Sequence, residues 1–335
     1  MVKRPQPAAQ EICTAGSRAF GLAIMTFAPE ALQDMSKLRV SVVEFLNTAP
    51  LVWGFTDGPL EGRYDLSFAV PAQCADDLRA GRVDIGVIPA IEYQRINDLV
   101  ILPGMAVAAK REVRSILVVS RRPIDRVRRL ALDHNSRSSI ALVRLLCQGP
   151  WRIEPEFVEA APDPAAMLAD ADAALLIGDP ALRVRLKMDA LSAKTPGESC
   201  CGGSDDEQPV EGVDTLFVYD VAQQWGEMTG KPCVLAVWAA RRDVVTPQVL
   251  ADFEASKDYG LANLGNIAEG AALKLDLPPR ELEIYLRENI DYSLDAENLA
   301  GLDLFYRLAA AANLIPPPRP IEFAAAPASA GQVTR

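Results

Sequence analysis

The N-terminal part of the chain alternates short apolar runs with segments whose apolar residues repeat every three or four positions. The run at 38–43 is rich in β-branched residues, further strands are expected at 65–70 and 83–88, and segments with helical patterns follow at 72–80 and 90–95. Apolar runs of this length are typical of buried strands, and strands that alternate with helices predict βαβ units and a parallel sheet. This part is therefore expected to be an α/β lobe.

A second set of alternating strands and helices follows two more apolar runs. Strands are expected at 100–108, 115–119, 129–132, 153–158 and 173–177, and helices at 136–147 and 163–169. After one more strand, at 234–239, every remaining segment has a helical pattern. This order predicts a middle lobe inserted between an N-terminal lobe and helices that pack back onto it, with a ligand cleft between the two lobes.

These patterns divide the chain into lobes and flanking segments. Residues 38–119 and 233–315 are expected to form one discontinuous lobe, and residues 120–232 the other. Within the second lobe, a stretch at 194–212 is poor in apolar residues and rich in Gly, Ser and acids, which predicts a mobile surface loop. The N-terminal extension, 1–37, and the Ala/Pro-rich end, 316–335, are expected to be disordered.

Charge and cysteine content narrow the class of protein. Among 335 residues, 34 are Lys or Arg and 45 are Asp or Glu, so the net charge is −11. An acidic chain is not expected to bind nucleic acid or an anionic membrane, and no apolar run approaches the roughly 20 residues of a bilayer span. The six cysteines include no CxxC pair, which favours reduced thiols in the cytoplasm. Nothing in the sequence indicates an oligomeric state.

His134 is the only histidine, which limits metal and nucleophile chemistry. A multi-His metal site is excluded, and a Ser-His-Asp or Cys-His centre would depend on this one residue. No GxGxxG or GxxxxGK[ST] loop follows a strand, so the sequence indicates neither a metal nor a nucleotide cofactor. His134 adjoins Asp133 at a strand-to-helix corner, where it is a candidate acid or base or, alternatively, a hydrogen-bonded loop residue.

Two strand-to-helix corners carry polar residues that suit a small anion. Asn47 precedes Thr48 and Pro50, and its amide can cap the helix or reach a substrate hydroxyl or carboxylate. The segment DHNSRSSI at 133–140 places three serines around a first helical turn. The N–H groups of a first turn have no partner within the helix, so this corner predicts an anion site, with plain capping as the alternative.

A third corner, IGDPAL at 177–182, follows the strand at 173–177. Gly178 lets a ligand approach the backbone. Asp179 is a candidate cap for the helix that begins at Pro180, and alternatively contacts the ligand or closes the cleft. The three corners together predict a two-lobed α/β protein whose cleft favours a small anion.

Five stretches together resemble the chorismate dehydratase family of the futalosine route to menaquinone. They are LRVSVVEFLNTAPLVWGF (38–55), AGRVDIGVIPAIEY (80–93), LALDHNSRSSIALVRLL (130–146), LLIGDPAL (175–182) and YDVAQQWGEMTGKPCVLAVWAAR (219–241). The resemblance covers roughly residues 38–312, and Ser138 stands where the family usually has Thr. It implies a two-lobed periplasmic-binding-protein type II-like fold, used in the cytoplasm as a hydro-lyase.

The reaction that the resemblance implies converts chorismate to 3-[(1-carboxyvinyl)oxy]benzoate and water. Loss of a ring proton and the ring hydroxyl makes an aromatic ring, so the enzyme has to fix geometry and polarise the leaving hydroxyl. Asn47 is the catalytic candidate for the group that touches this hydroxyl. The residues expected to bind the substrate are Thr48, Ser136, Ser138, Ser139, Gly178 and Asp179.

Two questions remain open at the level of sequence. No side chain is an obvious base, so the enolpyruvyl carboxylate of the substrate is an alternative to His134 or Glu44. The competing class is a non-catalytic solute-binding protein of an ABC transporter, because it shares the fold. Export would require a signal peptide or lipobox, and Cys13 lacks the usual residues before it, which favours the enzyme.

Overall fold

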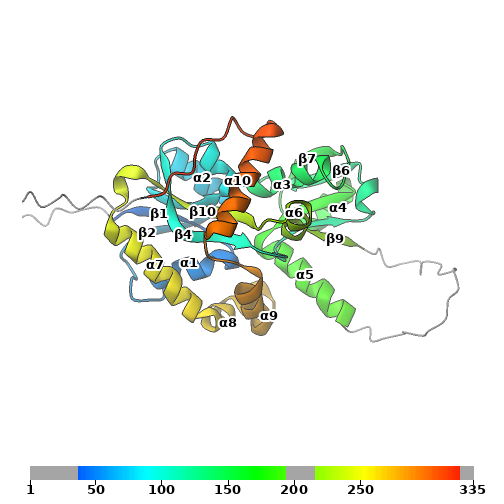
Figure 1. Cartoon of the computed structure of the whole chain (residues 1–335). Coiled ribbons are helices and arrows are strands. Elements are labelled where there is room, and N and C mark those ends of the chain that lie inside the picture. Colours follow the sequence, from blue (N-terminus) through cyan, green and yellow to red (C-terminus); the bar gives the residue numbers. More distant parts are fainter. Residues whose placement is uncertain (1–36, 194–215, 325–335) are drawn as a thin grey trace, which may run out of the picture. The chain divides into compact units, whose positions relative to one another are not determined.

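Two five-stranded sheets form the framework of the protein (Figure 1). The computed structural model describes residues 37–193 and 216–324. The first sheet contains, in spatial order, β2 (Asp65–Ala69), β1 (Arg39–Val43), β3 (Ile85–Pro89), β10 (Cys233–Arg241) and β4 (Leu99–Ala109). The second contains β7 (Glu156–Ala160), β6 (Arg129–Asp133), β8 (Ala173–Ile177), β5 (Ile116–Ser120) and β9 (Phe217–Asp220).

Both sheets are mixed, which corrects the expectation of parallel sheets. In the first sheet β10 runs antiparallel to β3 and β4, and in the second β5 runs antiparallel to β8 and β9. Each reversed strand is the first strand after the chain crosses from the other sheet. The remaining neighbours, such as β1 with β2 and β6 with β7, pair in parallel as the alternating pattern predicts.

Helices cover the sheets and begin at recognisable signals. Around the first sheet lie α1 (Ala49–Thr56), α2 (Pro71–Arg79), α7 (Pro247–Ala262), α8 (Leu264–Leu275), α9 (Pro279–Ile284) and α10 (Ala296–Ala311). Around the second lie α3 (Arg137–Gln148), α4 (Pro164–Asp170), α5 (Gly178–Ala193) and α6 (Val221–Thr229). Proline stands in the first turn of α1, α2, α4, α7 and α9, where its missing N–H has no intrahelical role.

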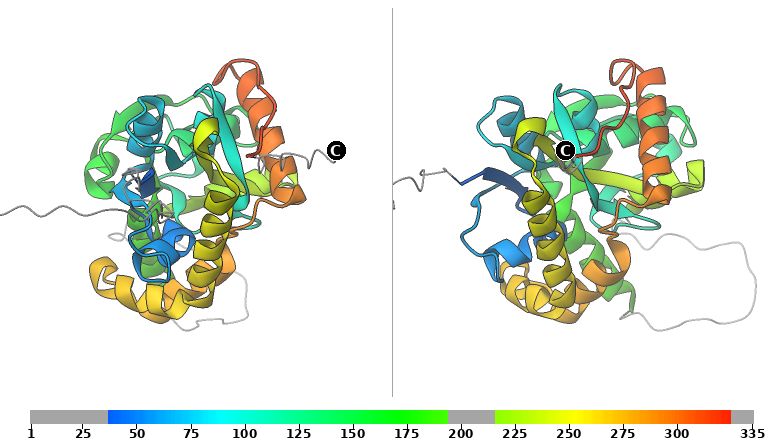
Figure 2. Two further views of the ribbon diagram at one scale, coloured as in Figure 1. Left: turned by 90° about the vertical axis from the view of Figure 1, so that its left-hand side faces the viewer. Right: turned by 60° about the vertical axis from the view of Figure 1, so that its left-hand side comes forward.

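The helices at the C-terminal end pack back onto the first sheet (Figure 2). Helix α7 lies against α1, α8 lies against α9, and α10 contacts β10 as well as α3 of the other lobe. A buried aromatic cluster supports this packing, because Phe253 of α7 meets Trp238 of β10 edge to face. Among the described residues, no helix has both the length and the apolar composition of a bilayer span.

Two expected boundaries differ from the structure. The strand expected at 115–119, at the end of the first lobe, is β5 (Ile116–Ser120) and pairs within the second sheet, so the chain crosses between lobes at about 110–115. The third strand of the second lobe was expected at 153–158 and lies at Glu156–Ala160, because its partner β6 begins at Arg129, which pairs with Glu156. Pairing with a neighbour, rather than local apolarity, sets where the strand starts.

Part of the expected C-terminal tail is ordered. Residues 316–324 pack along the first sheet, where the N–H of Ala324 donates to the carbonyl of Ile101 at 2.9 Å. The Arg319 guanidinium stacks on the Tyr93 ring at 3.9 Å and donates to the Tyr93 carbonyl. The expectation of disorder over 316–335 is therefore wrong for residues 316–324. The rest of that tail, the loop at 194–212 and the extension up to residue 36 lie outside the described residues.

Candidate active site

Residues from all three predicted corners line one cavity between the two sheets. Its volume is about 60 Å³, and its walls include the ends of β1, β3 and β8 and the first turns of α3 and α5. Apolar side chains, including Val107, Ile116 and Leu235, complete the wall. The predicted residues that line this cavity are Asn47, Thr48, Ser136, Ser138, Ser139 and Gly178.

The start of α3 presents unpaired donors to this cavity. The first intrahelical bond runs from the N–H of Ile140 to the carbonyl of Ser136 at 2.9 Å, and no side chain caps the helix. Within the described part of the chain, the N–H groups of residues 137–139 and the hydroxyls of Ser136 and Ser139 have no hydrogen-bond partner. Both serines are buried residues. Free donors at a buried helix N-terminus form an anion-binding site.

Two of the predicted hydroxyls already have partners in the protein. Ser138 Oγ accepts a hydrogen bond from the N–H of Ile91 in the short 3-10 helix η2 (Ala90–Gln94), at 3.2 Å. Its own O–H is left to donate toward the cavity. Thr48 Oγ1 donates to the carbonyls of Val43 and Phe45, so it stabilises the turn that carries Asn47. Thr48 is therefore placed to support the site rather than to donate to a ligand.

Asn47 lines the same cavity from the first lobe, in the 3-10 helix η1 (Leu46–Thr48), and it is buried. Its side chain neighbours Tyr285, the first residue of the π-helix η5 (Tyr285–Asn289). The Tyr285 hydroxyl donates to Ser115 Oγ at 2.8 Å. Burial raises the pKa of Tyr285 well above its usual value, and hydrogen bonding with Ser115 and Asn47 offsets this only in part. Tyr285 therefore stays a neutral hydroxyl that orders its polar neighbours.

Asp179 lies just outside the cavity and joins the lobes. Its Oδ1 accepts from the N–H of Leu46 at 2.9 Å, across the boundary between the second sheet and the first. Burial raises the pKa of the Asp179 carboxyl, and the hydrogen bond from Leu46 opposes that effect. Asp179 lines a neighbouring cavity of about 370 Å³, and Phe45 borders both cavities. Helix α5 begins at Gly178, so the expectation that it begins at Pro180 with Asp179 before it as a cap is wrong. Asp179 lies in the first turn, and its contact with Leu46 joins the two lobes.

Sequence reasoning missed three polar groups of this region. Arg137 lines the cavity and forms ion pairs with Asp76 and Glu92 of the other lobe. The sequence feature that could have indicated Arg137 is its position inside the serine-rich segment at 133–140. Tyr285 and Ser115 gave no such signal, because they are far apart in the chain and meet only in the fold.

His134 does not line the cavity. Its ring is exposed, and its Nδ1 lies 2.8 Å from the carbonyl oxygen of Ala160. This is the geometry of the hydrogen-bonded loop residue that was the alternative to an acid or base.

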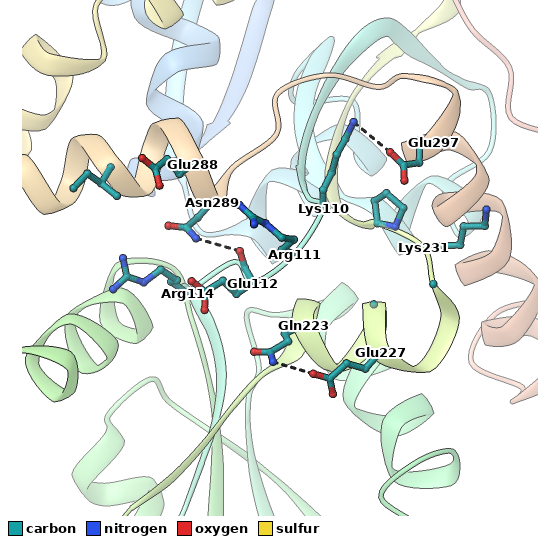
Figure 3. Close-up of a pocket in the computed structure, with 14 residues that line it drawn as sticks. Lys110, Arg111, Glu112, Arg114, Gln223, Glu227, Lys231, Glu288, Asn289 and Glu297 are labelled. Atoms are coloured by element: carbon teal, nitrogen blue, oxygen red, sulfur yellow. Dashed lines mark hydrogen bonds and ion pairs between the residues drawn. The ribbon is translucent and has the colours of Figure 1, made fainter. Parts of the chain in front are cut away.

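A second and larger cavity lies where the chain crosses between the lobes (Figure 3). Its volume is about 700 Å³, and the crossing segments 110–114 and 230–232 line it. Many of its charges are already engaged: Lys110 pairs with Asp295 at 2.8 Å, and Glu227 accepts from Gln223 at 2.9 Å. None of the predicted site residues reaches this cavity. The cleft between the sheets is therefore the candidate active site.

Fold and site define a protein of the periplasmic-binding-protein class, type II-like, with a polar cleft between two α/β lobes. Similar solved structures agree. A protein from Archaeoglobus fulgidus aligns with a TM-score of 0.63 at 19% identity, covering 83% of this chain and 98% of that one. The periplasmic aliphatic sulphonate binding protein of Escherichia coli aligns with a TM-score of 0.53 at 19% identity, covering 83% and 93%.

Sequence comparison identifies the family. The model of the menaquinone biosynthesis family matches residues 38–311. A chorismate dehydratase from Thermus thermophilus is 30% identical over 252 residues, which is 73% of this chain and 86% of that protein. The chain belongs to the menaquinone biosynthesis family.

Proposed function

We propose that this protein is a chorismate dehydratase, a hydro-lyase that converts chorismate to 3-[(1-carboxyvinyl)oxy]benzoate and water. The observation that carries the proposal is the start of α3, where three backbone N–H groups and two serine hydroxyls have no partner within the described residues and line the same cavity as Asn47. Chorismate carries two carboxylates and a ring hydroxyl, so it matches an anion site that is opposed by an amide. The family and the Thermus thermophilus relative support the same reading.

In the proposed reaction, the first turn of α3 holds one carboxylate through charge-assisted hydrogen bonds, each worth roughly 1.5–3 kcal/mol. Asn47 contacts the ring hydroxyl and stabilises the charge that develops as it leaves. A ring C–H proton is lost, its electron pair forms the new double bond, and the hydroxyl departs with a proton as water. The enolpyruvyl carboxylate of the substrate is proposed as the base, because no side chain in the cavity is an evident one.

The size of the cavity adds a step to this proposal. Small-molecule sites usually enclose roughly 300 Å³ or more, whereas the cavity here is about 60 Å³. A molecule of chorismate's size therefore enters when the lobes separate, and the contacts across the cleft form again around it. Asp179, which joins the lobes at Leu46, is proposed to take part in this closure.

Two further features are part of the proposal. The cytoplasm is the proposed location, and it is supported by the three described cysteines, which are buried free thiols: Cys74, Cys147 and Cys233. The alternative class, a solute-binding protein without activity, shares the fold and is separated from the enzyme only by turnover.

The test is to incubate the purified protein with chorismate and follow the products by chromatography and mass spectrometry. A new aromatic carboxylate lighter by one water is expected. The variant Asn47→Ala should lower kcat about 100-fold, because it removes one preorganised donor. His134→Ala is the matched control and should keep full activity, since His134 lies outside the cavity. Tight binding without turnover would assign the chain to the solute-binding class, and the opposite pattern in the two variants would refute the role of Asn47.

A further inference from the structure

Arg137 forms ion pairs that cross the cleft. It is the first residue of α3 and belongs to the second lobe, whereas its partners Asp76 and Glu92 belong to α2 and η2 of the first. The guanidinium donates to both carboxylate oxygens of Asp76, at 3.0 and 2.7 Å, and to Glu92 Oε2 at 3.1 Å. The pair with Asp76 is the bidentate kind, which fixes geometry as well as attracting charge.

The Glu92 partner is unusual because it is buried. Its side chain is 1% exposed, and three arginines surround it: Arg79, Arg95 and Arg137. A buried carboxylate is costly unless cations and hydrogen bonds compensate it. Arg79 and Arg95 come from the same lobe as Glu92, so Arg137 is the cation that reaches it from the other lobe.

The ion pairs lie beside the anion site. Ser138, the next residue, accepts from the N–H of Ile91 in η2, so two consecutive residues of α3 are fixed to the first lobe. Ser136 and Ser139, on the same turn, line the cavity, and their hydroxyls have no partner among residues 37–193 and 216–324. Docking the first turn of α3 on η2 thus fixes these donors in the cavity that Asn47 also lines.

Both terminal nitrogens of Arg137 donate to these carboxylates, which accounts for three of the five N–H donors of the guanidinium. These bonds fix the position of α3 relative to the first lobe. We propose that Arg137 is a positioning residue that holds the anion-binding turn of α3 against the first lobe when the cleft closes on the substrate. The kinetic part of this inference rests on the proposed dehydratase function, whereas the effect on closure does not.

Arg79 supplies a matched control for this proposal. It pairs with the same two carboxylates, Asp76 and Glu92, but all three residues lie in one lobe. Arg137→Gln and Arg79→Gln therefore remove the same charge from the same partners, and only the first removes a contact across the cleft. Arg137→Lys keeps the charge without the bidentate fork.

The experiment measures kcat and KM for chorismate together with small-angle scattering of the ligand-free variants. Arg137→Gln is expected to raise KM about tenfold with kcat nearly unchanged, and to increase the radius of gyration. Raising the salt concentration should increase KM of the native protein and have little effect on Arg137→Gln. Arg137→Lys should recover part of the loss, and Arg79→Gln should keep KM within about twofold of the native value.

Several results would overturn the inference. A fall in kcat with unchanged KM would make Arg137 a residue that contacts the reacting atoms. Equal kinetic and scattering changes in Arg137→Gln and Arg79→Gln would reduce its role to neutralising Glu92. If the native protein does not turn over chorismate, the proposed function fails, but the scattering comparison still decides closure. An unchanged radius of gyration in Arg137→Gln would then refute the positioning role.

Discussion

Gly178 occupies a point where the two lobes nearly touch. Its backbone has φ of +61°, a conformation that side chains disfavour, and a Cβ there would lie 2.6 Å from the ring of Phe45 in the other lobe. The residue was selected from sequence because a ligand could approach its backbone. The structure adds a second reason for glycine, which is that Phe45 needs the space for the lobes to meet.

We predict that Gly178→Ala raises KM for chorismate about tenfold, because overpacking of roughly 1–3 kcal/mol opposes closure. Gly230→Ala is the control: Gly230 also has positive φ, +67°, but a Cβ there would meet nothing within 4 Å. Both variants should lose about 1 kcal/mol of unfolding free energy from backbone strain. Steady-state kinetics and thermal unfolding measure the two effects, and equal KM values in the two variants would contradict the steric argument.

At the serine-rich corner, the residue types alone predicted which side chains line the cleft but not their hydrogen-bond partners. Ser136, Ser138 and Ser139 were all predicted to face the cleft, and all three line the cavity. Their individual partners were not predictable, because the acceptor role of Ser138 depends on Ile91, which is 47 residues away in the chain. Helical spacing identifies the face of a turn, but only the neighbouring lobe determines which hydroxyl remains free.

At the scale of elements, α6 begins at an unusual cap. Asp220 accepts hydrogen bonds from the N–H groups of Ala222 and Gln223, as an N-cap does, and also from those of Val113 and Arg114 in the crossing segment. Four backbone donors therefore depend on one buried carboxylate. The cap attaches the helix to the segment where the chain crosses between the lobes.

We predict that Asp220→Ala lowers the free energy of unfolding by roughly 2–4 kcal/mol, because it leaves several donors unsatisfied. Asp163→Ala is the matched control, since Asp163 caps α4 through Ala165 and Ala166 only. An ordinary cap is worth about 1 kcal/mol. Urea unfolding monitored by circular dichroism gives both values. If the two variants lose the same stability, the extra bonds of Asp220 contribute nothing measurable.

The elements themselves were largely predictable, but their partners were not. Alternating apolar runs located the strands of both sheets, and proline or acidic residues marked most helix starts. The reversed direction of β10 followed from its return between β3 and β4, which no local pattern reveals. The 316–324 segment was expected to be disordered because it is rich in proline, yet Arg319 binds Tyr93 of η2 and Ala324 bonds to Ile101 of β4.

For the whole molecule, the proposed closure involves charged groups and should therefore depend on pH. The hydrogen bond from Arg137 is the main cause that lowers the pKa of Asp76 below its ordinary value of 3.8. A lowered pKa means that the attraction is fully present above the ordinary value and is lost as the pH falls through the lowered one. The contact across the cleft should then weaken in acid.

We therefore predict that the radius of gyration of the ligand-free protein increases as the pH falls below about 3.8. Asp76→Asn removes the titrating group and should lack this step. Small-angle scattering across the pH range measures the change, and circular dichroism in the same samples separates opening from unfolding. A native protein and an Asp76→Asn variant that expand identically in acid would show that the pair does not govern closure.

The sequence by itself determined the alternation of strands and helices, the three corners and the family, because strands, helix starts and motifs depend on residues that are contiguous in the chain. Only the tertiary structure decided how the site is assembled. Leu46 and Asp179 are 133 residues apart, Arg137 and Asp76 are 61 apart, and Tyr285 meets Ser115 across 170. Contacts at such separations depend on how the chain crosses between the two sheets and how the two lobes pack against each other. Local periodicity contains no information about that arrangement.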